Sequence, residues 1–395
     1  MQATPKFLNS EYLKKLLREH FKENSLEIEN FTVSPGSSVG DNYACQILRI
    51  AIQLTSNNQK KSLSIIGKIM PDTDVSKEFT KTLDFFKVEN TMITEVLPSM
   101  YKKLCDRGDT ERLFPLLYKL DTDNKIILME DLKAQGFRMH GRHDLDLDHS
   151  LMAIKSLAKM HAASYLLLQE NQNLKDKFSE YFFKKDKEAV VAKYFNAAIQ
   201  YVVNTLDLWP ISEEDKNIMR SFQGKLYDLL CEGYERQDSS FNVIIHGDCW
   251  FNNMMFKYEE DKVVAVKLFD FQLSNFNSFA LDLHYHLFSS AKVEVITENL
   301  EKVFETYYKT FISITGEIKG FNMERIWKEF IERLAFGFGI GTMFRASMLA
   351  PKAFDFDGFL EGKNTSENFD IFISKRFISD TCNLLPFFKK YGIFK

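Results

Sequence analysis

The chain has 395 residues, of which 45% are hydrophobic and 27% are charged, and its net charge at pH 7 is −4. This length allows a large buried core and predicts two lobes or domains, and the charge balance gives no indication of a nucleic-acid partner. Its five cysteines have no metal-ligand spacing, which favours reduced thiols in the cytoplasm over a disulfide framework.

Neither a secretion signal nor a membrane-spanning segment is expected. The first residues lack a basic segment followed by an apolar one. The longest uncharged apolar stretch, residues 334–344, is too short to cross a bilayer and predicts a buried helix.

The first 130 residues predict mainly strands. Ser10 is the expected N-cap of an amphipathic helix. A later helix is expected over residues 76–96, with Pro98 helping to end it. The expected strands span residues 26–33, 43–54, 63–70, 113–120 and 126–129. In the second of them Leu48, Ile50, Ile52 and Leu54 share one face.

A glycine-containing segment joins the first two predicted strands. Glycines let backbone N–H groups approach phosphates closely. We therefore predict a phosphate-binding loop whose members are Gly36, Ser37, Ser38, Gly40 and Asn42. The spacing is not G-x-G-x-x-G, and an ordinary hairpin turn would look the same in isolation.

Two charged residues are predicted to be buried on apolar surfaces. Lys68 lies in an apolar strand, where it must extend to water or find a counter-charge. Glu89 falls close to the apolar stripe of the following helix, whereas Glu95 does not. A pair formed by Lys68 and Glu89 could position nucleotide phosphates. Taken alone, each of these charges would more often be a partly exposed surface group, and it is their combination upstream of the catalytic motif that favours the pair.

The strand at residues 126–129 runs into two acidic residues, a pattern typical of a hinge between two lobes. Met129 would border a nucleotide base, and the backbone of Glu130 and Leu132 would offer it a carbonyl and an N–H. An ordinary strand ending in a solvated turn fits the same residues. We predict a small β-rich lobe of residues 1–131 and a large helical lobe of residues 132–395.

The most informative pattern is H-x-D-x-x-x-x-N, followed seventeen positions later by D-F. Its members are His246, Asp248, Asn253 and Asp270. Phosphoryl transfer to a hydroxyl needs a carboxylate that accepts the hydroxyl proton and oxygen ligands for Mg²⁺. We assign Asp248 to the first role and Asn253 and Asp270 to the second. The alternative is that these residues merely shape a turn.

The flanking segments support the catalytic interpretation. Short strands are predicted at residues 241–245, 254–256 and 263–269. A hairpin would then bring Asp270 back beside the loop. Asp282 could cap a helix or accept hydrogen bonds from the loop backbone, and we prefer the second role.

The sequence also indicates roles for several residues outside these motifs. His161 lies on an apolar helix face and is predicted to be a hydrogen-bonded structural histidine. Cys249 lies inside the loop, where a small side chain is favoured over a nucleophile. Phenylalanine is frequent, with 37 residues, either as core filling or as an aromatic pocket. The candidate pocket rings are Phe276, Phe279, Phe288, Phe336, Phe338 and Phe344.

Several short motifs follow one another along the chain: G-x-x-x-G-D-N-Y, a strand lysine before Pro71, F-x-x-E, L-x-E-D-L, L-A-K-M-H-A, H-G-D-x-W-x-N-N-x-x-F, D-F-Q and D-L. Together they resemble the ecdysteroid kinase-like (CHK kinase-like) family, from about Gly36 to past Asp282. Two departures are Ile93, where such proteins often have tyrosine, and Phe269, where a smaller aliphatic residue is usual. Neither is a proposed catalytic group.

The resemblance implies an α+β, two-lobe protein kinase-like fold and an ATP- and Mg²⁺-dependent small-molecule kinase. The expected substrate is a hydroxyl of an ecdysteroid or of a steroid-like or phenolic xenobiotic. A choline- or ethanolamine-type kinase and a catalytically silent binding protein of the same fold are the alternatives. No obligate protein partner is predicted. The motifs do not specify the substrate, its pocket or the oligomeric state.

Overall fold

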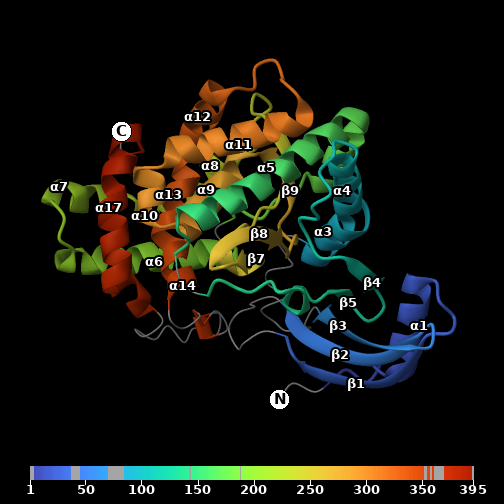
Figure 1. Cartoon of the computed structure of the whole chain (residues 1–395). Helices are drawn as coiled ribbons and strands as arrows, with labels where there is room; N and C mark the ends of the chain where they lie inside the picture. Colours follow the sequence, from blue (N-terminus) through green and yellow to red (C-terminus); the bar gives the residue numbers. More distant parts are fainter. Residues whose placement is uncertain are drawn as a thin grey trace. The chain divides into compact units, whose positions relative to one another are not determined.

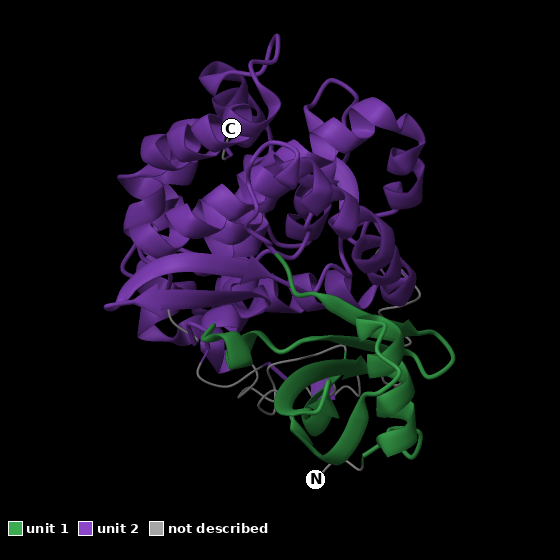
Figure 2. Cartoon of the chain, turned by 45° about the vertical axis from the view of Figure 1, so that its right-hand side comes forward, with its two compact units in different colours: residues 1–77, 114–138 green, residues 78–113, 139–395 purple. Residues whose placement is uncertain are grey.

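The computed structural model describes residues 4–36, 45–69, 84–141, 144–186, 188–350, 354–355, 358–359 and 369–393. Contacts divide the chain into two compact units, residues 1–77 with 114–138 and residues 78–113 with 139–395 (Figure 2). The predicted lobes are 1–131 and 132–395. The observed units have other boundaries than the predicted lobes. Residues 78–113, which include Glu89, belong to the second unit, and the first unit extends to residue 138, past the predicted hinge.

The first unit is built on an antiparallel sheet with strand order β1-β2-β3-β5-β4 (Figure 1). Its elements are α1 (Ser10–Phe21), β1 (Glu27–Pro35), β2 (Gln46–Ser56), β3 (Gln59–Ile69), β4 (Leu117–Asp121), β5 (Ile126–Glu130) and the short 3-10 helix η2 (Leu132–Gln135). The five predicted strands are therefore present. The fourth starts at Leu117 rather than at residue 113, because Pro115 lacks the N–H that a paired strand donates.

Apolar side chains at alternate positions of β2 form part of the core of this unit. Leu48, Ile50, Ile52 and Leu54 are buried as predicted, in one cluster with leucines of α1. A buried side chain of this kind stabilises the fold by about 1.5–3 kcal/mol relative to an exposed one. The prediction that Ser10 caps α1 is wrong. Asn9 has extended backbone, and its side-chain oxygen accepts the Tyr12 N–H at 3.0 Å.

The second unit is mainly helical. Its first helical elements are α3 (Phe85–Thr91), the π-helical turn η1 (Met92–Val96), α4 (Leu97–Cys105), α5 (Leu147–Glu170), η3 (Gln172–Phe178), α6 (Val190–Thr205), η4 (Leu206–Leu208), α7 (Glu213–Ser221) and α8 (Leu226–Tyr234). Its later ones are α9 (Ala280–Ser290), α10 (Val293–Thr297), α11 (Leu300–Thr315), α12 (Met323–Glu332), α13 (Leu334–Gly339), η6 (Ile340–Phe344), α14 (Arg345–Leu349), η7 (Asp370–Ile373) and α17 (Lys375–Tyr391). The long helices α5 and α11 lie side by side (Figure 1).

Two small antiparallel sheets interrupt these helices. They consist of β6 (Asn242–Ile245) with β9 (Asn275–Ser278) and β7 (Met254–Glu259) with β8 (Lys262–Leu268). The three strands predicted around the loop are present, but β9 is missed because its sequence is polar. Its polar side chains are nevertheless buried and hydrogen-bonded, for example Asn277 to the Tyr234 carbonyl and Ser278 to Glu329.

The prediction that the helix after residue 76 ends near Pro98 is wrong. The described helix begins at Phe85, passes through the π-helical turn η1 and continues as α4. Pro98 lies in the first turn of α4, where the π-helical turn shifts the hydrogen-bond register and removes the need for its N–H. Within the described ranges, no helix has the length and apolarity needed to cross a membrane. The apolar stretch from residue 334 forms α13 and η6, whose large apolar side chains are mostly buried, as predicted.

Candidate active site

The predicted catalytic loop lies between β6 and β7, and the β7–β8 hairpin brings the chain back beside it. Met254 pairs with Leu268, and the Phe269 N–H donates to the Asn253 carbonyl at 3.1 Å. The backbone just before Asp270 therefore lies against Asn253. This confirms the predicted hairpin arrangement.

His246 joins the two halves of the motif. Its Nε2 lies 3.1 Å from the Phe269 carbonyl oxygen, and its Nδ1 accepts the Asp248 N–H at 3.3 Å. Because a carbonyl can only accept, Nε2 carries the proton of a neutral ring. Burial lowers the pKa of His246 and keeps this neutral form. The histidine thus fixes the backbone before Asp270 relative to the backbone of Asp248.

Asn253 holds the proposed base. Its Nδ2 donates both to the Asp248 backbone carbonyl, at 2.9 Å, and to the carboxylate Oδ2, at 2.8 Å. With its nitrogen used in this way, the amide presents Oδ1 as its remaining polar atom. The arrangement orients a carboxylate and leaves a neutral oxygen ligand beside it.

The backbone at two motif positions adopts the left-handed conformation. Asp270 has φ 66°, and Gly247 has φ 81°. Such conformations are uncommon outside glycine and concentrate at functional sites. At Gly247 a Cβ atom would also lie 2.2 Å from the Leu273 carbonyl oxygen. Only glycine fits between His246 and Asp248, a requirement that the sequence prediction did not include.

Asp282 anchors the loop from α9, as predicted. Its carboxylate accepts the His246 N–H at 2.8 Å and the Gly247 N–H at 2.9 Å. His161 contacts the same carboxylate at 3.0 Å and the Tyr307 hydroxyl at 2.9 Å, which confirms its structural role. Burial alone would raise the pKa of Asp282, but these hydrogen bonds outweigh it and lower the pKa.

Further contacts from α9 complete this anchoring. The Cys249 thiol donates to the Asp282 backbone carbonyl at 3.1 Å, and the Ser290 hydroxyl accepts the Phe251 N–H at 3.0 Å. Burial raises the pKa of the Cys249 thiol well above its usual value. Since the thiolate is the reactive form, Cys249 is unsuited to act as a nucleophile.

Lys68 and Glu89 are buried, as predicted. Lys68 lies in β3 with a 3% exposed side chain, between Ile47 and Ile127 of the neighbouring strands. Glu89 lies on α3 and is 1% exposed, whereas Glu95 is exposed and paired with Lys177. The two buried charges belong to different units, and their pairing stays a prediction.

The predicted hinge is fastened to the sheet by Asp131. Its carboxylate accepts hydrogen bonds from Arg49 on β2 at 2.7 Å, from Ser64 on β3 at 2.7 Å and from the Lys133 N–H at 3.1 Å. Burial alone would raise the pKa of Asp131, but the hydrogen bonds and the charge of Arg49 outweigh burial, so the pKa is lowered. The sequence indicates only that Arg49 lies on the face of β2 opposite the apolar one, and it does not indicate that Arg49 contacts the hinge segment.

The predicted adenine-binding positions flank this anchor. Met129 pairs with Ile66 in the sheet, and the Glu130 N–H donates to the Leu116 carbonyl at 2.9 Å. Leu132 is buried at the start of η2. Their contact with a nucleotide base stays a prediction.

The predicted phosphate-binding loop is described only at its first residue. The Gly36 N–H donates to the Ile47 carbonyl at 2.9 Å and so continues the β1–β2 ladder. Any phosphate contacts of this loop therefore have to come from other residues. The remaining predicted members lie outside the described residues: Ser37, Ser38, Gly40 and Asn42.

Most of the candidate pocket phenylalanines belong to the core. Four of the rings are at most 1% exposed and pack against other rings: Phe279, Phe288, Phe336 and Phe338. Phe276 and Phe344 are only partly buried. The prediction of an aromatic substrate surface is thus wrong for the first four rings and stays open for the last two.

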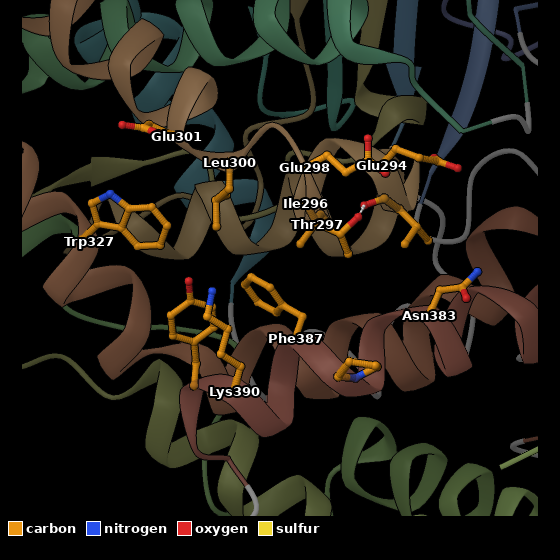
Figure 3. A pocket seen from close by; sticks show the side chains of 13 residues that line it. Glu294, Ile296, Thr297, Glu298, Leu300, Glu301, Trp327, Asn383, Phe387 and Lys390 are labelled. Atoms are coloured by element: carbon orange, nitrogen blue, oxygen red, sulfur yellow. Dashed lines mark hydrogen bonds between the residues drawn. The ribbon is translucent and has the colours of Figure 1, made fainter.

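A surface groove of about 680 Å³ lies between α17 on one side and α10 with the start of α11 on the other (Figure 3). Its lining includes Glu294, Glu298, Trp327 and Phe387 and none of the predicted site residues. The groove is separate from the motif that carries the proposed chemistry.

In the described part of the chain, no group of three or more His, Cys, Asp and Glu side chains could hold a metal ion. Mg²⁺ does not require one, because nucleotide phosphates and water supply most of its ligands. The oxygens of Asn253 and Asp270 are of the type that Mg²⁺ prefers.

The antiparallel sheet, the helical second unit and the anchored H-x-D loop together define an α+β, two-lobe protein kinase-like fold. Residues 39–320 match the model of the ecdysteroid kinase-like family, and the chain belongs to that family. The chain is accordingly a small-molecule kinase by class.

No curated protein sequence matches the chain significantly. Among solved structures, a choline/ethanolamine kinase family protein from Mesorhizobium loti is similar over 91% of this chain and 90% of its own, with 11% identity and a TM-score of 0.40. A microcompartment-associated aminopropanol kinase is similar over 98% and 99%, with 10% identity and a TM-score of 0.44. Similarity at this identity and TM-score gives no information on the function of this chain.

Proposed function

We propose that this chain transfers the γ-phosphoryl group of ATP, bound with Mg²⁺, to a hydroxyl of an ecdysteroid or of a steroid-like or phenolic xenobiotic in the cytoplasm. The main support for this proposal is the placement of the Asp248 carboxylate. Asn253 donates a hydrogen bond to it. Asp282 of α9 binds the backbone of the same loop at His246 and Gly247. The substrate class comes from the family to which the chain belongs.

Each residue has a defined task in this reaction. Asp248 accepts the proton of the substrate hydroxyl as its oxygen bonds to the γ-phosphorus. The bond from that phosphorus to the ADP oxygen breaks, and ADP leaves with the electron pair. Asn253, through Oδ1, and Asp270 would hold Mg²⁺, which neutralises charge on the phosphates. Lys68, paired with Glu89, would position the α- and β-phosphates.

An ATP-consumption screen tests the proposal. Wild-type protein and Asp248→Asn are compared with ecdysteroids, phenols, glycosides and choline as acceptors. Removal of a general base lowers kcat by roughly 10²–10⁴-fold, while binding of Mg·ATP is expected to persist. Near wild-type turnover by the variant would remove Asp248 from this role.

The acceptor pattern separates the remaining alternatives. Labelling of choline with no labelling of ecdysteroids or phenols would identify a choline-type kinase. Binding of a steroid or phenol with no transfer to any alcohol would identify a catalytically silent protein.

A further inference from the structure

The surface groove between α10 and α17 has a row of carboxylates along one wall. Glu294, Glu298 and Glu301 line the wall that α10 and the start of α11 form (Figure 3). All three are exposed, and none forms an ion pair within the part of the chain that the structure describes. Glu305, one turn further along α11, does pair with Lys309. The negative charge of the groove wall is thus available to a ligand.

Aromatic rings line the other parts of the groove. Trp327 comes from α12, and Phe387 and Tyr391 come from α17. The centroid of the Tyr391 ring lies 6.2 Å from that of Trp327 and 4.9 Å from that of Phe387. Trp327 in turn packs edge-on against the buried ring of Phe304, with 4.7 Å between centroids. Rings that are held in place before a ligand arrives lower the entropic cost of binding.

The size of the groove fits one small molecule. Its volume of about 680 Å³ lies within the range of roughly 300–1,000 Å³ that is typical of ligand pockets. Ile296 and Leu300 add apolar surface to the wall that carries the glutamates (Figure 3). An apolar body would be removed from water against these side chains and the rings, while a positively charged group would meet the carboxylates.

The chain itself places a cation on one of these rings. The Nζ atom of Lys390 lies 5.0 Å from the centroid of the Tyr391 ring, within the distance of roughly 6 Å over which an aromatic face attracts a cation. The Lys390 side chain is exposed, so its ammonium group can move into water. The aromatic surface of the groove is therefore open to a cation.

We propose that the groove is a binding site for an organic cation, with an ammonium group on an apolar or aromatic body. The carboxylates of the wall and the faces of Trp327 and Tyr391 attract the ammonium group. An anion would be repelled by the same carboxylates, and a neutral compound would gain nothing from them. None of the predicted site residues lines the groove, so this site is separate from the proposed acceptor site and does not depend on the kinase reaction.

Binding of benzyltrimethylammonium to the full chain tests the proposal. The compound combines a quaternary ammonium with an aromatic ring and has no hydroxyl that could accept a phosphoryl group. Calorimetric titration is expected to give a Kd on the order of 1 mM, as for other ligands of this size. N-benzylacetamide is the uncharged control and should bind roughly tenfold more weakly. No binding of the cation, or equal affinity for the two compounds, would overturn the proposal.

The glutamates are tested together, because a single exposed charge contributes little. The triple variant Glu294→Gln, Glu298→Gln and Glu301→Gln should weaken binding of the cation by roughly tenfold. Glu305→Gln is the matched control, because Glu305 lies on α11 but does not line the groove, and its Kd should equal that of wild type. Equal Kd values in the triple variant and in wild type would contradict the proposed site.

Lys390→Met is expected to increase the affinity. The substitution removes the cation that competes for the Tyr391 ring, so Kd for benzyltrimethylammonium should fall by about threefold. Damage to packing would weaken binding, and a gain therefore separates a ligand site from a structural role of these side chains. Unchanged or weaker binding would show that the cation does not use this ring and would overturn its assignment.

Fluorescence and one further variant locate the bound cation. Trp327 is partly exposed, whereas Trp209 and Trp250 are buried, so the cation should change tryptophan fluorescence in wild type but not in Trp327→Phe. Asp248→Asn should bind the cation as wild type does. Weaker binding in Asp248→Asn with no change in the triple variant would place the cation in the proposed acceptor site. Self-association that the triple variant abolishes would identify a second copy as the occupant, and either result would overturn the proposal.

Discussion

Two buried aspartates, Asp282 in the second unit and Asp131 in the first, organise the backbone of the predicted site in different ways. Asp282 is 0% exposed and accepts two backbone N–H groups of the catalytic loop in addition to His161. Asp131 is 4% exposed, and its charged partner is Arg49, whose side chain is 26% exposed. One carboxylate mainly binds backbone, whereas the other mainly binds side chains of the sheet.

This difference determines what happens when a contact is lost. The N–H groups of His246 and Gly247 have no access to water once Asp282 is changed, because this part of the loop is buried. Unsatisfied buried donors are costly. Around Asp131 the partly exposed position of Arg49 lets water replace part of the lost interaction. We therefore expect the loop anchor to be far more sensitive to substitution than the hinge anchor.

Asp282→Asn tests the loop anchor and is expected to have the largest effect. The carboxylate uses both oxygens for the two backbone N–H groups and His161, whereas the amide keeps only one oxygen, so at least one of these partners loses its acceptor. Loss of one member of a buried charged network costs about 3–5 kcal/mol, and kcat should fall by at least about 10²-fold because the loop loses its geometry. Urea unfolding and ATP consumption measure the two effects.

Asp146→Asn is the matched control for this substitution. Asp146 also accepts a backbone N–H near a helix start, that of His149, but its side chain is 50% exposed. Asparagine is an equally good N-cap, so the free energy of unfolding should change by less than about 1 kcal/mol. Equal losses at Asp282 and Asp146 would contradict the special role of the loop anchor.

Gly247→Ala tests the same anchor through its backbone. The added Cβ meets the Leu273 carbonyl oxygen, and positive φ adds strain of about 1–3 kcal/mol. Displacement of Asp248 should lower kcat by about 10-fold to 10²-fold. Gly108→Ala is the control, because Gly108 has φ 83° but open space around its Cβ position.

The control variant should lose stability from strain alone and keep its kcat. The ratio of kcat losses at the two glycines then isolates the effect of loop displacement. Equal kcat in Gly247→Ala and wild type would show that the loop tolerates the shift.

The parts of this site that the sequence predicts share a physical basis. The loop and its hairpin follow from apolar strands on either side of a short polar motif, a local pattern. The role of Asp282 follows from an acidic residue placed where a buried helix begins. Burial of Lys68 and Glu89 follows from their apolar neighbours in the sequence.

The parts that the sequence does not predict depend on contacts between distant segments. Arg49 and Asp131 are far apart in the chain and meet only through the strand order β2-β3-β5. The polar strand β9 resembles a loop, because its buried asparagines find partners on α8 that no local pattern reveals. The four core phenylalanines show that composition alone does not distinguish core from pocket.

Arg49→Met tests the hinge anchor and is expected to have the smallest effect of the three. Asp131 keeps Ser64 and the Lys133 N–H, so the free energy of unfolding should fall by only about 1–3 kcal/mol at pH 7. Because the predicted nucleotide contacts flank Asp131, KM for ATP should rise several-fold while kcat is largely kept. Lys60→Met, which breaks an exposed pair with Glu29 on the same sheet, should cost less than about 1 kcal/mol.

The pH dependence of the free energy of unfolding shows whether Arg49 acts through the charge of Asp131. The pKa of Asp131 is lowered in the folded chain, so its contribution to stability is present above the unfolded value of about 3.9 and is lost as pH falls through the folded value. Arg49→Met removes part of that contribution, and its difference from wild type in unfolding free energy should be largest near pH 7 and shrink toward pH 3. A difference that stays constant over this range would show that Arg49 stabilises the sheet through its aliphatic stem rather than through the charge of Asp131, and the hinge anchor would then not be electrostatic.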